Sequence, residues 1–302
     1  MEKICVLMST YNGAKYLRDQ IDSILNQKGV KVELIVRDDG SCDETIDILN
    51  EYSRNGALRF YKGNNLGPAQ SFMDLVMNAP DASYYAFADQ DDVWDDDKLL
   101  VGVQSLEKYD KEPALYYSNL RIVDKNLKLF RYAHDKPAVD VNKFSSLLVN
   151  YCTGCTEVFN LNLMKILKKG KIDYLCMHDW WVYIVCSFFG KIVYDNTPHI
   201  SYRQHGSNVV GMDLKCNLIK YFFIKVKRIL FDKCDTRRLN ALSFYNIYGN
   251  MLNSDDKAIV GKLVTYKNSF FKKMSLICDG SLKTNSCVKN FFLCVVVLLG
   301  KI

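Results

Sequence analysis

Short apolar segments alternate with segments of helical periodicity through residues 1–118, and this alternation is the feature that most constrains the fold. A run such as 4–8 is apolar throughout, as expected for a strand buried on both faces. Helical spacing follows it at 17–25. Strands alternating with helices predict βαβ units, so we expect an α/β fold with a mostly parallel sheet. The predicted strands are 4–8, 32–36, 58–61, 84–88 and 115–117, and the predicted helices are 17–25, 45–52 and 71–77.

Polar clusters follow the first four predicted strands at the point where each strand ends. They are STYNG at 9–13, RDDGSCDET at 37–45, KGNNLGP at 62–68 and DQDDVW at 89–94. Ligands of open α/β sheets bind at the carboxyl ends of the strands, so these clusters predict one binding crevice. Neither G-x-G-x-x-G nor G-x-x-x-x-G-K-[ST] stands at the first turn, which removes the main support for a dinucleotide-binding or P-loop site.

Four carboxylates lie within seven residues after the fourth strand: Asp89, Asp91, Asp92 and Asp95. Such crowding is unfavourable without a cation, and carboxylates with phosphate oxygens are natural ligands of a hard divalent ion. We therefore interpret Asp89 and Asp91 as metal or ligand residues. Residues 95–97 are interpreted instead as the first turn of a helix, where acidic side chains are favoured.

Asp38 and Asp39 form a second acidic pair, followed by Gly40 and Ser41. The pair is typical of a tight turn before a helix cap, and a carboxylate at this strand end could also accept hydrogen bonds from a nucleobase or ribose. Both interpretations can hold together.

At this point the chain resembles the family-2 inverting glycosyltransferases of the GT-A fold, most of all the bacterial rhamnosyltransferase-type enzymes of cell-surface polysaccharide synthesis. The resemblance covers about two thirds of the chain, and its motifs occur in the family's order. They are VLMSTYNGAKYLRDQIDSILNQ at 6–27, VRDDGSCDET at 36–45, NNLGPAQSF at 64–72, FADQDDVW at 87–94, HDWW at 178–181 and YRQHGSNVVG at 202–211.

The resemblance implies a role for each cluster on the donor side. Ser9, Tyr11 and Asp39 would contact the nucleobase and ribose of a nucleotide-sugar donor, with Asp38 in support. Asn65 in the third cluster is also expected to bind the donor, and Arg203 would pair with its diphosphate as a fork of donors.

The resemblance also implies the catalytic groups. Asp91 would hold Mg²⁺ or Mn²⁺ on the donor diphosphate, with Asp89 near the ribose or the ion's water shell. His205 would reach the diphosphate or the metal, or would be structural. Asp179 occupies the place of the family's general base, which takes the proton of the acceptor hydroxyl.

On the acceptor side we expect Trp180, Trp181 and Gly154. An indole beside Asp179 either stacks on a sugar or fills the core, and we expect one of each. Gly154 lies within a single C-x-x-C at 152–155, for which packing is the expected role because no second ligand pair exists.

The C-terminal third is basic: residues 211–302 carry 16 Lys and Arg against 6 Asp, a net charge of +10, whereas residues 1–210 carry −4. Segment 217–233 forms an amphipathic basic helix on a helical wheel, which would either pack on the catalytic domain or dock on an anionic membrane surface. The apolar run 291–299 would pack against it or enter the interface. We predict a GT-A domain at 1–211, with a donor half at about 1–118 and an acceptor half at about 119–211, and a basic helical tail at 212–302.

Eleven cysteines, an odd number spread along the chain, favour reduced thiols in a cytoplasmic protein. No signal peptide or transmembrane helix is expected, so any membrane contact would be peripheral.

The resemblance implies a metal-dependent inverting glycosyltransferase that moves a sugar to a hydroxyl of a growing, lipid-linked bacterial surface polysaccharide. It also implies dTDP-rhamnose as the first expected donor, with a UDP-hexose as the second. The alternatives are a nucleotidyltransferase, which would need a Gly-rich phosphate loop, and a non-catalytic module that binds an anionic surface. No nucleic-acid partner is expected, since no recognition motif accompanies the basic tail; the tail could support a homo-oligomer.

Overall fold

The computed structural model describes residues 1–133, 142–205, 235–282 and 287–302. These residues form two compact units. Unit 1 contains 1–133, 150–169 and 177–205, and unit 2 contains 142–149, 170–176, 235–282 and 287–302. The predicted domain boundary near Gly211 and the predicted basic helix at 217–233 lie outside the described residues.

Unit 1 contains the α/β elements. Its strands are β1 (Lys3–Thr10), β2 (Lys31–Asp38), β3 (Leu58–Lys62), β4 (Tyr84–Ala88), β5 (Val93–Trp94), β6 (Ala114–Ser118), β7 (Arg121–Val123), β8 (Leu129–Tyr132), β9 (Val158–Asn160), β10 (Lys191–Asp195) and β11 (Ile200–Arg203). Its α-helices are α1 (Ala14–Leu25), α2 (Thr45–Arg54), α3 (Pro68–Asn78), α4 (Lys98–Leu106), α5 (Leu161–Leu167) and α6 (His178–Phe189), with 3-10 turns at Glu107–Tyr109 and Gly154–Thr156.

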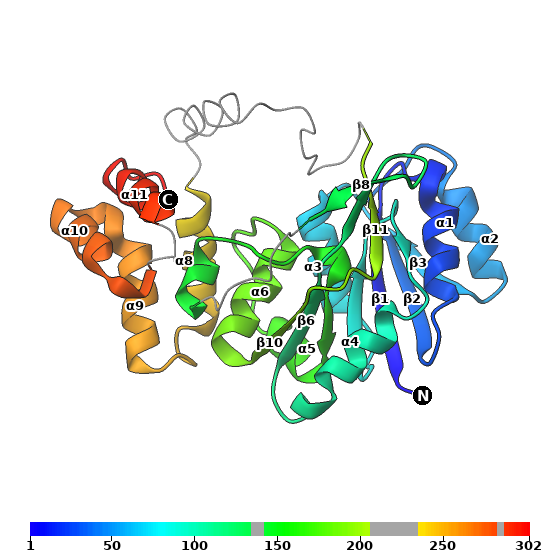
Figure 1. The fold of residues 1–302 in the computed structure, drawn as a ribbon, viewed down its shortest axis with the longest axis horizontal. Coiled ribbons are helices and arrows are strands. Elements are labelled where there is room, and N and C mark those ends of the chain that lie inside the picture. The colour runs from blue at the N-terminus through cyan, green and yellow to red at the C-terminus, as the bar shows by residue number, and fades with distance from the viewer. Residues whose placement is uncertain (134–141, 206–234, 283–286) are drawn as a thin grey trace. The chain divides into compact units, whose positions relative to one another are not determined.

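A seven-stranded sheet with the order β10-β6-β9-β4-β1-β2-β3 organises unit 1 (Figure 1). β1 pairs in parallel with both β2 and β4. β9 lies antiparallel between β4 and β6, so the sheet is mixed but mostly parallel. The predicted α/β fold is confirmed, and each of the five predicted strands and three predicted helices is present within a few residues of its expected bounds.

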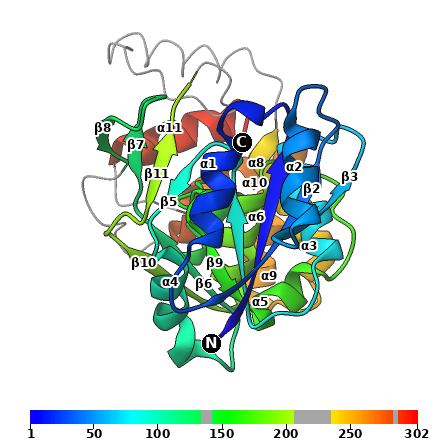
Figure 2. The same cartoon turned by 90° about the vertical axis from the view of Figure 1, so that its right-hand side faces the viewer.

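Helices cover both faces of this sheet, which is why its central strands read as continuous apolar runs (Figures 1 and 2). Alternate residues of β1 and β4 pack against the apolar faces of α1, α2 and α4. The opposite face contacts α3 and α5. Every residue of β4 is buried, so its carboxyl end presents the following loop from a rigid base.

Unit 1 also contains a second sheet of four strands in the order β5-β11-β7-β8, whose members alternate along the chain with strands of the large sheet. β11 pairs antiparallel with β5, which directly follows the acidic loop, and parallel with β7. This pairing brings the residues after β11 to the acidic loop.

Unit 2 is helical in its described residues, as predicted for the C-terminal region. Its helices are α8 (Thr236–Tyr248), α9 (Ser254–Thr265), α10 (Phe270–Cys278) and α11 (Cys287–Leu298), with 3-10 turns at Lys143–Leu147, Tyr266–Asn268 and Gly280–Leu282. Its buried residues include Phe244, Tyr248, Val260, Leu263 and Tyr266. None of the helices in the described residues is long and apolar enough to cross a membrane.

Candidate active site

The loops after β1, β2 and β4 meet at the carboxyl edge of the large sheet. The backbone N–H of Tyr11 donates to Gln90 Oε1 at 2.8 Å, and Gln90 Nε2 donates to the Tyr11 carbonyl at 3.1 Å. Asn12 N–H donates to Ser41 Oγ at 2.9 Å. The predicted convergence of the polar clusters is therefore present in the hydrogen bonds between them.

Gln90, for which the sequence indicated no role, joins the loops after β1 and β4. The approach is so close that a Cβ on Gly13 would lie 2.1 Å from Gln90 Oε1, so a side chain at position 13 would require the Gln90 amide to move. Gly13, the last residue of the first polar cluster, was the available signal, but its partner 77 positions away is not readable from sequence.

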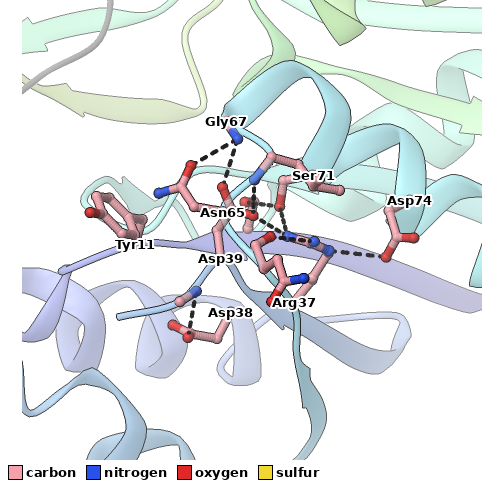
Figure 3. Close-up of polar contacts among 12 residues, drawn as sticks. Tyr11, Arg37, Asp38, Asp39, Asn65, Gly67, Ser71 and Asp74 are labelled. Atoms are coloured by element: carbon pink, nitrogen blue, oxygen red, sulfur yellow. Dashed lines mark hydrogen bonds and ion pairs between the residues drawn. The ribbon is translucent and has the colours of Figure 1, made fainter. Parts of the chain in front are cut away.

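Asp39 points into the protein, where its partners are backbone groups and one cation (Figure 3). It is 3% exposed and accepts from the N–H groups of Leu66 and Gly67 at 2.9 Å each. Gly67 has φ of +74° and directly precedes α3, so the carboxylate faces a helix N-terminus, where negative charge is favoured. Arg37 Nη1 donates to the same carboxylate.

Asp38 is also buried, at 1% exposure, and holds the turn that follows β2 (Figure 3). It accepts from Thr10 Oγ1 at 3.1 Å and from Ser41 N–H at 2.9 Å. The tight-turn interpretation of the DDGS cluster is what this geometry supports. The oxygens of Asp38 and Asp39 already have protein partners. Contact of either carboxylate with the nucleotide-sugar donor therefore stays a prediction.

Arg37 connects this turn to α3 and to the β3 loop (Figure 3). Its guanidinium donates to Asp74 Oδ2 at 3.0 Å, to Ser71 Oγ at 2.9 Å and to the Asn64 carbonyl at 3.0 Å. Ser71 Oγ lies 2.6 Å from Ser9 Oγ, so the end of β1 is tied to the same network.

Tyr11 and Asn65 are the predicted donor residues that face solvent. Tyr11 is 47% exposed, and Asn65 is exposed while its Oδ1 accepts from Gly67 N–H at 3.1 Å. Both therefore have side-chain surface free to meet a ligand, in contrast to Asp38 and Asp39.

Residues from later in the chain contact the acidic loop 89–92. Asp91 Oδ2 lies 2.7 Å from His205 Nε2, and Asp92, which is fully buried, accepts from Arg203 N–H at 3.0 Å. Ligand atoms of Asp89, Asp92 and Cys155 all lie within 4.8 Å of one another. Burial and the neighbouring charge of Asp91 raise the pKa of Asp89 to about 7, and burial raises the pKa of Asp91 as well.

This donor set fits a divalent cation. Carboxylate oxygens suit Mg²⁺ and Mn²⁺, and an imidazole nitrogen is an acceptable further ligand. The raised pKa values show that ionised carboxylates are unfavourable here without a compensating positive charge. Asp91 contacts His205 directly, whereas the ligand atoms that lie together are those of Asp89, Asp92 and Cys155. The expected set of Asp91, Asp89 and His205 therefore stays a prediction, and Asp92 and Cys155 are further candidate ligands that it did not include.

Lys98 is a buried cation near this loop that sequence reasoning missed. It is 0% exposed, its Nζ lies 3.7 Å from the Trp94 ring centroid, and burial lowers its pKa to about 7. The charges of Cys155, Asp92 and Glu157 act in the opposite direction. A lysine at the start of an amphipathic helix reads as a surface residue, so the sequence carried no signal for it.

Residues 95–97 lie directly before α4 and not in its first turn, where they were expected, and Asp97 at the N-cap makes no side-chain cap hydrogen bond. Asp97 contacts His199 Nδ1 at 3.0 Å instead. Asp95 pairs with Arg121 and Asp96 with Lys28. Basic partners from distant parts of the chain compete successfully with the local helix end.

The Arg203 guanidinium binds oxygen atoms of the protein. From the sequence it was expected to pair with the donor diphosphate instead. It is 3% exposed and donates to the carbonyls of Asp91 and Lys125 at 2.9 and 2.8 Å, and to Asp19 Oδ2 at 3.0 Å. Its ring contact is with Tyr16, at 4.4 Å from the centroid. The geometry favours a residue that holds the acidic loop.

Asp179 lies in the first turn of α6 and is 8% exposed. Trp180 N–H donates to Asp179 Oδ1 at 2.6 Å. Burial raises the pKa of Asp179 to about 6, while hydrogen bonds from Trp180, Asn150 and Gly154 act to lower it. The charge of Asp179 in turn contributes to the raised pKa of Asp89, so the two carboxyls belong to one electrostatic site.

Gly154 packs directly against the start of α6. A Cβ there would lie 2.6 Å from His178 Nε2 and 3.3 Å from Asp179 Cβ. His178 is buried and stacked on Phe72 at 3.9 Å, and burial lowers its pKa to about 3, so its ring is neutral. The 154 loop and α6 thus define the position of Asp179.

Both indoles of the HDWW cluster are buried. Trp181 is fully buried and Trp180 is 8% exposed, so only Trp180 retains surface that a sugar could reach. Cys152 and Cys155 are free, buried thiols, as expected from a packing role, and Cys155 Sγ lies within 4.8 Å of carboxylate oxygens of Asp89 and Asp92.

The sequence of the chain is similar to those of known glycosyltransferases. The model described as "Glycosyl transferase family 2" matches residues 5–168, more than half of the chain. The dTDP-rhamnosyl transferase RfbG of Shigella flexneri is 27% identical over 280 residues, covering 85% of this chain and 91% of that protein. An uncharacterized glycosyltransferase of Nostoc sp., alr2836, is 28% identical and covers 68% of this chain and 66% of that protein.

Two solved structures are similar in fold. S. aureus TarS 1-349 has a TM-score of 0.56 at 16% identity, covering 99% of this chain and 80% of that chain. The mannosyltransferase PcManGT from Pyrobaculum calidifontis, in complex with GDP-Man and Mn²⁺, has a TM-score of 0.50 at 13% identity, covering 98% and 80%. The family match includes the loops after β1, β2 and β4 and ends before Asp179, Arg203 and His205.

Proposed function

The chain belongs to glycosyl transferase family 2, and from that premise we propose that it is a metal-dependent inverting enzyme of bacterial surface-polysaccharide synthesis. It moves a sugar from a nucleotide diphosphate to a hydroxyl of a growing, lipid-linked glycan. Family membership favours this function over the nucleotidyltransferase and over a non-catalytic binding module.

One observation carries the proposal: the acidic loop 89–92 and Asp179 form a single electrostatic site at the carboxyl edge of the sheet. The loop supplies ligands for a cation beside an anionic donor. Asp179 supplies a carboxylate whose pKa of about 6 leaves it mostly ionised at neutral pH and yet able to accept a proton.

In the proposed reaction the acceptor oxygen attacks the anomeric carbon of the donor sugar. A C–O bond forms there while the bond to the diphosphate oxygen breaks on the opposite side, and the hydroxyl proton passes to Asp179. Asp91, Asp89 and His205 would hold Mn²⁺ or Mg²⁺, which supplies charge neutralisation for the departing diphosphate. Arg203 and Gln90 hold the loops that carry these groups.

The donor side is proposed around Tyr11, Asn65 and Ser9, with Asp38 and Asp39 shaping the turn or reaching the nucleoside after a local shift. The likeness to RfbG supports dTDP-rhamnose as the donor. The TarS structure with UDP-GlcNAc supports a UDP-sugar as the second candidate, and the PcManGT complex with Mn²⁺ supports Mn²⁺ as the ion. Trp180 and Gly154 belong to the acceptor side.

Thermal-shift measurements with dTDP, UDP, GDP and their sugars test the proposal, each with Mn²⁺ and with EDTA. A ligand at ~100 times its Kd stabilises a protein by ~2.7 kcal/mol, which is a readily measured shift. A shift that requires Mn²⁺ and is largest for one base supports the function and identifies the donor class. The absence of a shift with every diphosphate contradicts it.

A further inference from the structure

Helix α10 exposes the apolar side of its surface. Phe270 is 65% exposed, Phe271 84% and Met274 37%, and at about 100° per residue these three lie within one arc of about 100°. Leu276 is the one residue of the helix that is buried. A helix that merely covered a core would show the reverse pattern, with its apolar arc inward.

Helix α11, which packs on α10, also exposes apolar side chains. Phe291 is 67% exposed and Leu298 45%, and their separation of seven residues places them on the same side of the helix. α10 and α11 contact each other, and Lys273 Nζ donates to the Leu298 carbonyl at 2.7 Å (Figure 1). We call the exposed residues Phe270, Phe271, Met274, Phe291 and Leu298 the α10–α11 surface.

Lysines outnumber acidic residues in the segment that carries the α10–α11 surface. Between residues 266 and 302 the sequence has six lysines and a single acidic residue, Asp279, and Lys262 pairs with Asp279 at 2.7 Å. Lys272 is exposed and directly follows Phe271 in α10, and Lys301 follows α11. The exposed apolar side chains are therefore carried by a segment of positive net charge.

We propose that the α10–α11 surface docks on an anionic lipid bilayer. Phenylalanine and leucine side chains enter the boundary between headgroups and acyl chains, and the lysines meet lipid phosphates, each worth about 1 kcal/mol near such a surface. Exposed apolar patches mark interaction sites. A second copy of this chain fits less well, because a two-fold contact places two positively charged segments against each other.

This inference rests on residues other than the segment 217–233, which lies outside the described residues, and does not depend on the donor chemistry. It places the enzyme on the membrane peripherally, through one helical face.

Sedimentation of the full chain with vesicles tests the proposal. Vesicles of phosphatidylcholine with phosphatidylglycerol should bind the protein at least tenfold more tightly than vesicles of phosphatidylcholine alone, and added salt should weaken the binding. The variant Phe270→Ser/Phe271→Ser should lose at least tenfold in affinity, and Lys272→Glu should lose about fivefold or more. Phe130→Ser is the matched control, since Phe130 is 52% exposed in β8 of unit 1.

Circular dichroism and the shift with a nucleotide diphosphate establish that the variants fold and keep the donor site. Equal binding to both vesicle types, or unchanged binding by the double variant, overturns the proposal. So does a dimer in sedimentation velocity that the double variant converts to a monomer while vesicle binding is absent; that outcome assigns the surface to a second copy.

Discussion

Gln90 shows how one amide can set the spacing of a binding site. Its two hydrogen bonds with the Tyr11 backbone fix the loop after β1 relative to the acidic loop. Gly13 leaves just enough room for that amide. Neither residue takes part in the chemistry of the proposed reaction, yet both determine the positions of the loops that carry the reacting groups.

Gly13→Ala should therefore weaken donor binding. The new Cβ displaces the Gln90 amide, so two hydrogen bonds of about 1 kcal/mol each no longer hold the Tyr11 loop before the donor binds. Donor binding must then order that loop, and we expect the donor affinity to fall by about tenfold. Donor titration followed by calorimetry measures this. Gly261→Ala in α9 is the control, because its Cβ meets nothing closer than 3.9 Å. Adding Gly13→Ala to Gln90→Ala should cost little more than Gln90→Ala alone; full additivity would refute the steric mechanism.

Asp179→Asn should reduce transfer by ~10²–10⁴-fold while leaving donor affinity nearly unchanged, because the amide cannot accept the acceptor proton. In the unsubstituted enzyme the rate should fall as pH drops through about 6, where Asp179 becomes protonated, and should be about tenfold lower one pH unit below that value. A pH profile of kcat/KM and a single-turnover assay measure both effects. Asp81→Asn, at an exposed loop, is the control. Substantial transfer by the Asp179 variant would assign the base elsewhere.

Arg37→Met should destabilise unit 1 by about 3–5 kcal/mol, because Asp39 would be left buried without its cation. Urea unfolding followed by tryptophan fluorescence measures the loss. Arg59→Met on the neighbouring strand is the matched control: Arg59 is largely exposed and its pair with Glu33 should contribute less than about 1 kcal/mol. Similar losses in both variants would show that the buried network is not the source.

At the scale of elements, β11 decides how the acidic loop is supported. Its pairing with β5 and β7 brings Arg203 to the Asp91 carbonyl and His205 to the Asp91 carboxylate. The antiparallel strand β9 pairs with both β4 and β6, and this pairing similarly fixes the preceding loop at 154, which packs against Asp179. Strands that complete the sheets late in the chain thus position loops formed early in it.

Arg203→Lys should raise the Mn²⁺ concentration needed for half of the donor-induced thermal shift by about tenfold. An ammonium cannot make the three separate contacts of the planar guanidinium, so the acidic loop loses its support. Arg121→Lys on β7 is the control, since Arg121 makes comparable contacts with Asp95 and the Pro198 carbonyl, outside the acidic loop. An unchanged Mn²⁺ requirement for Arg203→Lys would mean that the loop stands without it.

At the scale of the whole molecule, the candidate active site and the proposed membrane-docking surface belong to different units. Every group of the candidate active site lies in unit 1, and the α10–α11 surface lies in unit 2. The three tryptophans, Trp94, Trp180 and Trp181, are also all in unit 1, so their fluorescence reports on that unit alone.

Mn²⁺ with the cognate diphosphate should therefore raise the midpoint of tryptophan-detected thermal unfolding. Phe270→Ser/Phe271→Ser should leave that ligand-induced shift unchanged, because the donor binds unit 1. Fluorescence-detected melting of the full chain with and without ligand measures this. Loss of the shift in this unit 2 variant would show that the donor site depends on unit 2.

Much of the fold was readable because it rests on local pattern. Continuous apolar runs and helical spacing predicted the first strands and helices, and polar residues at strand ends predicted where the loops meet. Unit 2 was predicted as helical, but the short segments at 142–149 and 170–176 that join it from earlier in the chain were not predicted. β9 was missed because three residues give too little periodicity.

The sequence by itself determined the α/β class, the acidic loop and the family's motifs, because each depends on neighbouring residues. Only the tertiary structure decided how the polar groups are used. Asp39 turns inward to backbone amides, Arg203 is occupied by protein oxygens, and Asp91 meets His205 across 114 positions of sequence. Such partners are chosen by the packing of distant strands, and the burial that shifts their pKa values exists only once those strands have assembled.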